Sequence, residues 1–256
     1  MPHTLNVYTL PKLVEPEELA GATVVVIDVL RASTTIVHAL EAGAKEVIPC
    51  ETVDEALAVA RDTPDDDMVL AGERGGLPID GFRLGNSPRE FNLHSVGGKV
   101  VVFTTTNGTR AIARARGADR VLIGAFVNAT AVFNELVEEE RIALICAGTR
   151  GQIGLDDVLL AGMLVERLQR RGGLLYEQNA QAVAARETWL QAFALPRVLG
   201  AEPLEPERLA GELRKSPGGK NLLELGMEED ILAAAEIDRF HGVPELDREG
   251  VRIRLG

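Results

Sequence analysis

The residues best suited to chemistry lie in the segment Thr23–Thr35, whose sequence is TVVVIDVLRASTT. Its β-branched run predicts a strand that is buried on both faces of a parallel sheet and ends at Asp28. Arg31 follows at once, and Ser33 or Thr34 is suited to cap a helix that begins there. A carboxylate, a guanidinium and a helix N-terminus this close together indicate an anion site with a metal ligand. The same residues would also suit an ordinary strand–turn–helix with a capping serine.

Further carboxylates occupy loop positions along the chain. Glu73 follows a second predicted strand, and Asp156 and Asp157 lie near the start of a later helix. Mg²⁺ favours oxygen ligands and is commonly held by one or two carboxylates. Asp28, Glu73, Asp156 and Asp157 are therefore the candidate ligands for a metal ion. Asp28, Glu73 and Asp157, together with Arg31, form the predicted catalytic set, although Asp156 and Asp157 would suit a helix start without further function.

Arginines and hydroxyl groups beside glycines form a second set of candidates. Arg74 and Arg150 adjoin glycine-rich loops, and arginine offers the planar paired donors that suit phosphate and sulfonate. Thr106 to Thr109 precede another predicted helix, which would give a second anion cradle. A surface salt bridge is the alternative for each arginine, most of all for Arg110. The expected substrate ligands are Ser33, Thr34, Thr35, Arg74, Thr106, Asn107, Gly108, Thr109 and Arg150.

The elements that carry these residues follow one order twice. Each copy reads strand, loop, helix, strand, helix, strand and glycine loop, and aligning Gly43 with Gly117 places Thr35 on Thr109. We predict an α/β fold of three layers, α/β/α, with an internal duplication of a β/α unit and a largely helical C-terminal part. The first unit covers 1–98, and the second covers 99–256 with the C-terminal helices, without a flexible linker. Ligands of parallel sheets gather at the carboxyl ends of strands, so the site should lie between the copies.

Composition limits the class of partner. The 256 residues carry a formal net charge of −12, which argues against nucleic acid or an anionic membrane as a partner. Hydrophobic residues make up 46% and aromatic residues 4%, so the core is aliphatic. Only two cysteines occur, and no apolar run approaches the length of a membrane span, so we expect a cytoplasmic protein. A compact aliphatic enzyme is often a dimer, and a homodimer is one assembly that the sequence allows.

Several motifs in order resemble those of the 2-phosphosulfolactate phosphatase family, a group of Mg-dependent phosphatases. The resemblance covers nearly the whole chain and implies hydrolysis of a small phosphorylated acid, 2-phosphosulfolactate, to sulfolactate and phosphate in coenzyme M biosynthesis. The family usually has Glu-Asp where this chain has Asp156-Asp157, so a role for Asp157 follows more directly than one for Asp156. The matching motifs are DVLRASTT, AGERGG at 71–76, GFRLGNSP at 81–88, TTNGTRAI at 105–112, CAGTRG at 146–151 and the stretch from Ser216 to Pro244.

Other phosphatase and hydrolase types are weighed against the same residues. A haloacid dehalogenase needs a second aspartate two places after the first, where this chain has Leu30, and a Cys-Xaa5-Arg loop is absent. A cysteine hydrolase of isochorismatase-like type would use Asp28 and Cys146. The duplication places Cys146 on Leu70, which favours a small core residue instead. The cysteine hydrolase and a non-catalytic anion-binding protein are the two alternatives to the phosphatase.

Overall fold

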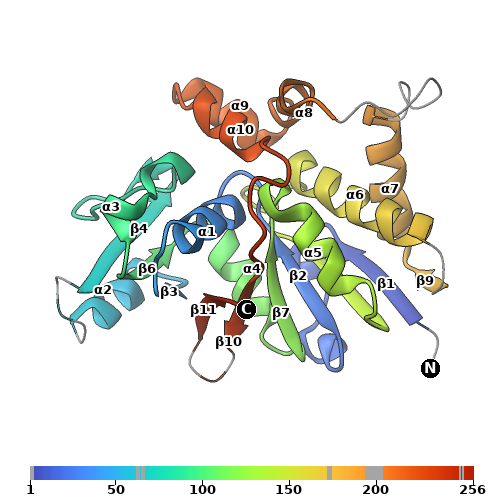
Figure 1. Cartoon of the computed structure of the whole chain (residues 1–256), viewed down its shortest axis with the longest axis horizontal. Helices are drawn as coiled ribbons and strands as arrows, with labels where there is room; N and C mark the ends of the chain where they lie inside the picture. Colours follow the sequence, from blue (N-terminus) through green and yellow to red (C-terminus); the bar gives the residue numbers. More distant parts are fainter. Residues whose placement is uncertain are drawn as a thin grey trace.

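The computed structural model of the chain describes residues 3–61, 64, 67–171, 175–193, 204–247, 249 and 251–256. Within these residues, one mixed sheet has helices packed on it, and Figure 1 shows the arrangement. The predicted α/β fold is confirmed. No helix in the described ranges has the length and apolar character needed to cross a membrane.

The helices and strands have the following bounds. The strands are β1 (His3–Tyr8), β2 (Thr23–Ile27), β3 (Glu46–Pro49), β4 (Met68–Arg74), β5 (Leu77–Pro78), β6 (Val100–Thr104), β7 (Arg120–Gly124), β8 (Arg141–Cys146), β9 (Tyr176–Gln178), β10 (Pro244–Asp247) and β11 (Arg252–Leu255). The α-helices are α1 (Ala32–Glu41), α2 (Val53–Arg61), α3 (Leu93–Val96), α4 (Gly108–Ala115), α5 (Ala129–Leu136), α6 (Leu155–Arg171), α7 (Ala180–Phe193), α8 (Pro206–Leu213), α9 (Pro217–Glu224) and α10 (Glu228–Ala234).

The strand order shows how the two predicted copies are interleaved. It runs β5-β4-β6-β3-β11-β10-β7-β2-β8-β1-β9. Strand β2 lies parallel between β7 and β8, and β6 lies parallel between β3 and β4, so each copy places its first strand between two strands of the other. The antiparallel hairpin of β10 and β11 joins the two parallel groups. The division into units 1–98 and 99–256 stays a prediction, and any such units share one sheet.

Helix lengths change the alignment of the copies by two residues. Helix α1 has 10 residues and α4 has 8, so aligning the glycines that follow the helices does not align the helix starts. When Ala32 is matched to Gly108 at the two helix starts, Thr109 corresponds to Ser33. The prediction that Thr109 corresponds to Thr35 was therefore wrong.

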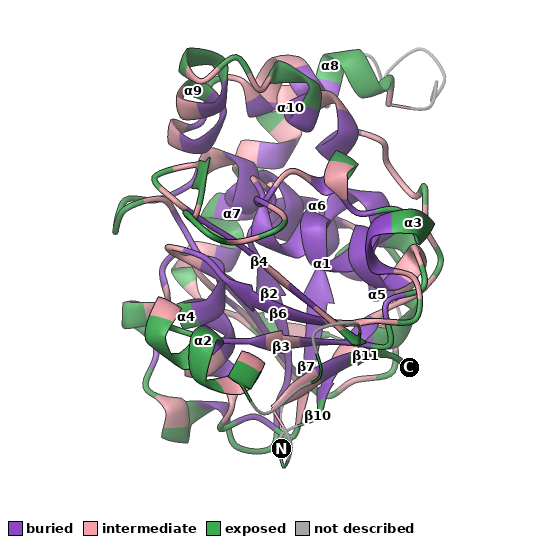
Figure 2. Cartoon of the chain, turned by 90° about the vertical axis from the view of Figure 1, so that its left-hand side faces the viewer, coloured by how far each residue is buried: buried purple, intermediate pink, exposed green. Residues whose placement is uncertain are grey.

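Both faces of β2 are covered, as its continuous apolar run predicts. Val24 and Val26 pack into a core that also contains residues of α1 and α4, whereas Val25 and Ile27 pack into a second core with residues of α5, α6 and α7. Figure 2 shows buried residues along the sheet and along α1 and α6. Strand β2 is therefore held on both sides, which fixes the position of Asp28 at its end.

The C-terminal helices cover the site. Figure 1 shows α8, α9 and α10 grouped on one side of the molecule, and Figure 2 shows the same group from a second direction. Helix α9 contributes Gly218, Asn221 and Leu222 to a pocket that also contains Asp28. The helical part of the chain thus closes over the carboxyl ends of the strands.

Candidate active site

A pocket lies where loops at the carboxyl ends of β2, β4, β6 and β8 meet α9. The structure brings six of the predicted residues to its lining, which are Asp28, Arg31, Glu73, Thr106, Asn107 and Arg150. Further lining residues that were not predicted include Asn86, Thr149, Gly218, Asn221 and Leu222. The pocket therefore combines residues of both copies, at the strand ends where the sequence places it.

Asp28 carries a buried carboxylate at the edge of the pocket. It is 6% exposed, and its Oδ1 accepts a hydrogen bond from the backbone N–H of Ala32 over 3.2 Å. Burial, together with the carboxylates of Asp156 and Glu73, raises the pKa of Asp28 to about 7. Among the described residues, no hydrogen-bond donor is found for its Oδ2. Asp28 therefore has one carboxylate oxygen available for a ligand.

Asp156 is a second buried carboxylate with an unused oxygen. Its Oδ2 accepts the backbone N–H of Leu30 over 3.2 Å, whereas its Oδ1 is buried and has no partner within the described part of the chain. Burial is the main reason that the pKa of Asp156 is raised to about 6. Asp156 does not line the pocket itself, but it contacts the turn that carries Asp28 and Arg31.

Asp157 holds the backbone of two loops. Its Oδ1 accepts the N–H of Val29 over 2.8 Å, and its Oδ2 accepts the N–H of Gly148 over 2.9 Å. These bonds join the turn after β2 to the loop after β8. Asp157 lies outside the pocket lining and is 2% exposed, and its contacts position the two loops. The catalytic role expected from the sequence stays a prediction.

Glu73 joins the other pair of loops in the same way. Its Oε2 accepts the N–H of Gly76 and its Oε1 accepts the N–H of Thr106, each over 2.7 Å. Unlike Asp157, Glu73 lines the pocket. Its carboxylate therefore contributes negative charge to the pocket while it fixes the loops after β4 and β6.

The hydroxyl groups at the start of α1 point into the fold. Ser33 accepts the backbone N–H of Asp28 over 2.9 Å, and Thr34 donates to a carbonyl of the same turn. Thr35 donates to the carbonyl of Asn86 over 2.9 Å. All three side chains are at most 2% exposed and lie outside the pocket lining. Their hydroxyls fix the turn, and Asp28 itself accepts an N–H group at the start of α1. A role of these three residues in holding the substrate stays a prediction.

Three other predicted ligands have internal partners or structural roles. Arg74 donates to the carbonyl of Glu73 and to the hydroxyl of Thr104, and Thr109 bonds within its own turn. Gly108 allows a close approach, because a Cβ there would lie 2.4 Å from that of Ala32. None of these three lines the pocket. Their sequence context, a loop with glycine and hydroxyl groups, is shared by packing residues and ligand residues.

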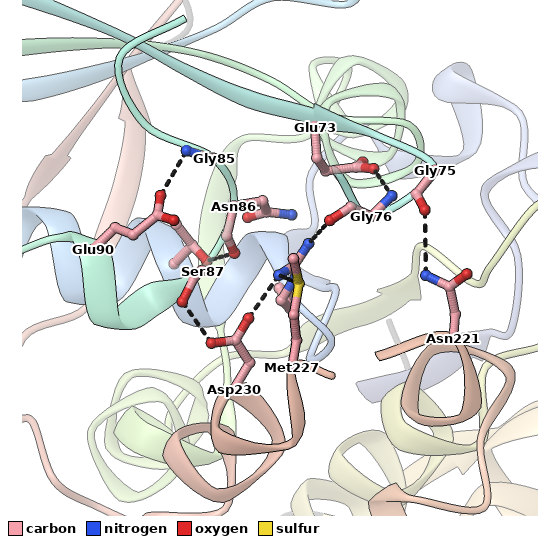
Figure 3. A network of polar contacts seen from close by, with 12 residues as sticks. Glu73, Gly75, Gly76, Gly85, Asn86, Ser87, Glu90, Asn221, Met227 and Asp230 are labelled. Carbon is pink, nitrogen blue, oxygen red and sulfur yellow. Dashed lines mark hydrogen bonds and ion pairs between the residues drawn. The ribbon is translucent and has the colours of Figure 1, made fainter. Parts of the chain in front are cut away.

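Arg31 and Arg150 occupy different depths of the site. Arg31 is 4% exposed and forms an ion pair of 2.6 Å with Asp230. Figure 3 shows the polar contacts around Asp230. Arg150 is exposed, its backbone N–H donates to Asn107 over 3.1 Å, and its side chain donates to Asn221 over 3.4 Å. The site therefore has one buried and one exposed guanidinium.

Sequence reasoning missed Asn86, Ser87 and Asp230, which lie together in Figure 3. The hydroxyl of Ser87 donates to Asp230 over 2.5 Å. Asn86 and Ser87 fall within the motif GFRLGNSP, and Asp230 falls within the matching stretch near the C-terminus, so the motifs held a signal. An acidic residue in the first turn of a helix is, however, ordinarily a solvated or capping residue.

Two findings bear on metal and thiol chemistry. In the described ranges, no group of three or more His, Cys, Asp and Glu side chains is arranged to hold a metal ion. Cys146 is fully buried, and burial together with the nearby Asp157 and Asp156 raises the pKa of its thiol well above the usual value. Cys146 is a buried residue of β8, and Leu70, on which the duplication places it, is a half-buried residue of β4. The cysteine-hydrolase alternative is not supported, because a thiolate is disfavoured there.

Comparison with known proteins agrees with these motifs. The family described as 2-phosphosulpholactate phosphatase matches residues 8–249. A protein of Symbiobacterium thermophilum named "Probable 2-phosphosulfolactate phosphatase" is 44% identical over 229 residues, which are 89% of this chain and 92% of that protein. A protein of Deinococcus radiodurans with the same name is 43% identical over 224 residues, 86% of each chain. One of Caldanaerobacter subterraneus, also of that name, is 35% identical over 97% of both chains. The chain belongs to the 2-phosphosulpholactate phosphatase family.

Proposed function

We propose that this protein is a Mg²⁺-dependent phosphatase that hydrolyses 2-phosphosulfolactate to sulfolactate and phosphate. The observation that carries the proposal is the pocket in which buried Asp28 and Arg31, both from the family motif DVLRASTT, face residues from the other strand ends. The family and the names of the relatives support the reaction.

The donor set suits Mg²⁺ although it lacks three clustered ligands. Asp156 Oδ1 is buried without a partner among the described residues, and Asp28 Oδ2 has no hydrogen-bond donor there. Burial, with the carboxylates of Asp156 and Glu73, raises the pKa of Asp28. Mg²⁺ usually keeps several waters and needs only one or two carboxylates. We therefore assign Asp28 and Asp156 as the residues that would hold the ion. When bound, Mg²⁺ would supply neutralisation of phosphoryl charge and a more acidic water.

The two arginines suit the two ends of the substrate. Phosphosulfolactate carries phosphate, sulfonate and carboxylate on a three-carbon frame. Arg31 lies at the buried end near Asp28 and would hold the phosphoryl group, whereas Arg150 lies at the exposed end and would hold a non-reacting acid. Thr106 Oγ1 and Asn86 Oδ1 are buried without partners in the described ranges, and both residues line the pocket. These two atoms are available for polar groups of the substrate or for bound water.

The experiment is an assay of phosphate release from a panel of phosphorylated hydroxyacids, with Mg²⁺ and with a chelator. We expect turnover that requires the metal, and Asp28→Asn should remove most of it while the far-UV circular dichroism stays that of the wild type. Cys146→Ala is the control, because it should leave turnover nearly unchanged in a phosphatase and abolish it in a cysteine hydrolase. Anion binding without turnover would instead favour a non-catalytic protein. The cytoplasmic location, the place in coenzyme M biosynthesis and a homodimer stay predictions.

A further inference from the structure

We propose that Asp230 of α10 is a positioning residue that fixes the guanidinium of Arg31 in the pocket, so that its remaining N–H groups can bind the anion. The proposal rests on the proposed function, because it concerns the same pocket. The two residues are separated by 199 positions in the chain, so only the fold brings them together.

The contact between Asp230 and Arg31 is buried and short. Each side chain is 4% exposed, and Arg31 Nη1 donates to Asp230 Oδ2 over 2.6 Å. The other oxygen of Asp230 accepts the hydroxyl of Ser87 over 2.5 Å, so the carboxylate is held at both ends, as Figure 3 shows. Removing one member of a buried ion pair is strongly destabilising, because the other charge then lacks a partner.

Counting the donors of Arg31 shows that two of them have no acceptor in the described ranges. A guanidinium has five N–H groups. Nη1 donates to Asp230 and to the sulfur of Met227 over 3.2 Å, and Nη2 donates to the carbonyl of Gly76 over 2.7 Å. No acceptor is found among the described residues for Nε–H or for the second Nη2–H. Because Arg31 lines the pocket, these two N–H groups are the ones that remain to bind an anion there.

Asp230 also fixes a second part of the pocket. Ser87 adjoins Asn86, whose side chain lines the pocket and whose carbonyl accepts the hydroxyl of Thr35. One carboxylate therefore holds both the arginine and the loop that presents the Asn86 amide. Helix α10 is thus part of the active site in function, although its own residues stand behind those that line the pocket.

The test is a double-mutant cycle on kcat/KM. Asp230→Ala should lower kcat/KM by about 10- to 100-fold, because it releases a charge-assisted contact of Arg31. In the Arg31→Ala background, the same change should cost less than about twofold, since Asp230 acts through Arg31. Asp230→Asn keeps one acceptor oxygen and should recover part of the loss. Glu229→Gln, an exposed neighbour on the same helix, is the control and should match the wild type.

Two results would overturn the proposal. One is an Asp230 variant that keeps kcat/KM within twofold of the wild type, and the other is an equal loss with and without Arg31.

Where Asp230→Ala does not fold, the cycle is run with Asp230→Asn, and thermal denaturation reports the folded fraction. Calorimetric titration with inorganic phosphate gives a readout without turnover, in which the Asp230 variant should bind at least about 10-fold more weakly. A wild type that hydrolyses no phosphoester would refute the proposed function, whereas the phosphate titration would still decide the role of Asp230.

Discussion

Gly108→Ala distinguishes two roles for a residue of the motif TTNGTRAI. If Gly108 serves as part of a backbone anion cradle, alanine keeps the N–H group and the change should be mild. The structure gives it another role, because a Cβ at this position would lie 2.4 Å from the Cβ of Ala32 and 2.7 Å from Asp28 Oδ2. The starts of α1 and α4 therefore meet at a point where only glycine fits.

The expected magnitude follows from these contacts. An ordinary contact begins at 3.4 Å, so Asp28 Oδ2 must retreat by 3.4 − 2.7, or about 0.7 Å, from the new methyl group. Overpacking costs about 1–3 kcal/mol. We expect the Tm to fall by about 2–12 °C, because each kcal/mol corresponds to about 2–4 °C in a protein of this size. A displacement approaching 1 Å at a reacting group costs up to about 100-fold in rate.

The assay measures Tm by circular dichroism and kcat/KM by phosphate release. Gly211→Ala is the matched control, because Gly211 lies within α8 and a Cβ there would meet nothing within 4 Å. That variant should be unchanged in activity and more stable by up to about 1 kcal/mol. The reasoning fails if Gly108→Ala keeps both the Tm and the kcat/KM of the wild type, since α1 and α4 would then not meet as described.

Three further predictions address charge and pH. Arg150→Ala should lower kcat/KM for a phosphorylated diacid by about 10-fold or more and hardly affect a simple phosphomonoester, whereas equal losses on both substrates would contradict the assignment of Arg150 to the non-reacting acid. Asp157→Asn should lower the free energy of unfolding by about 1–3 kcal/mol, because an amide has one acceptor oxygen for the N–H groups of Val29 and Gly148, and denaturant titration measures this loss. Burial, with a smaller effect of Arg239, lowers the pKa of His38 to about 4. The unfolded chain therefore binds the proton at a higher pH than the folded protein, and the free energy of unfolding decreases as the pH falls from about 6.5 to 4. His38→Leu should make the free energy of unfolding nearly independent of pH in this range, and unfolding at several pH values measures this. If the slope against pH is the same as in the wild type, His38 is not responsible.

The sequence determined the local parts of this protein. The run from Val24 to Ile27, followed by Arg31 and small polar residues, encodes a buried strand and then a helix through side-chain periodicity and capping, both of which act within a few residues. It also placed Asp28 at the carboxyl end of that strand, where the structure finds the pocket. The motifs in order identified the family, which the comparison then confirmed.

Only the tertiary structure decided which polar groups are free. Glu73, Asp156 and Asp157 have the same chemistry in the sequence, but Glu73 and Asp157 use both oxygens on backbone N–H groups, while Asp156 keeps one oxygen without a partner in the described ranges. Those N–H groups belong to loops brought together by the interleaving of β2 and β6 with strands of the other copy. The pairing of Arg31 with Asp230 likewise depends on how α10 packs over the strand ends. Residue type determines which hydrogen bonds a side chain can form, whereas long-range packing determines which partners come within reach. The spacing of residues along the chain does not show which partners these are.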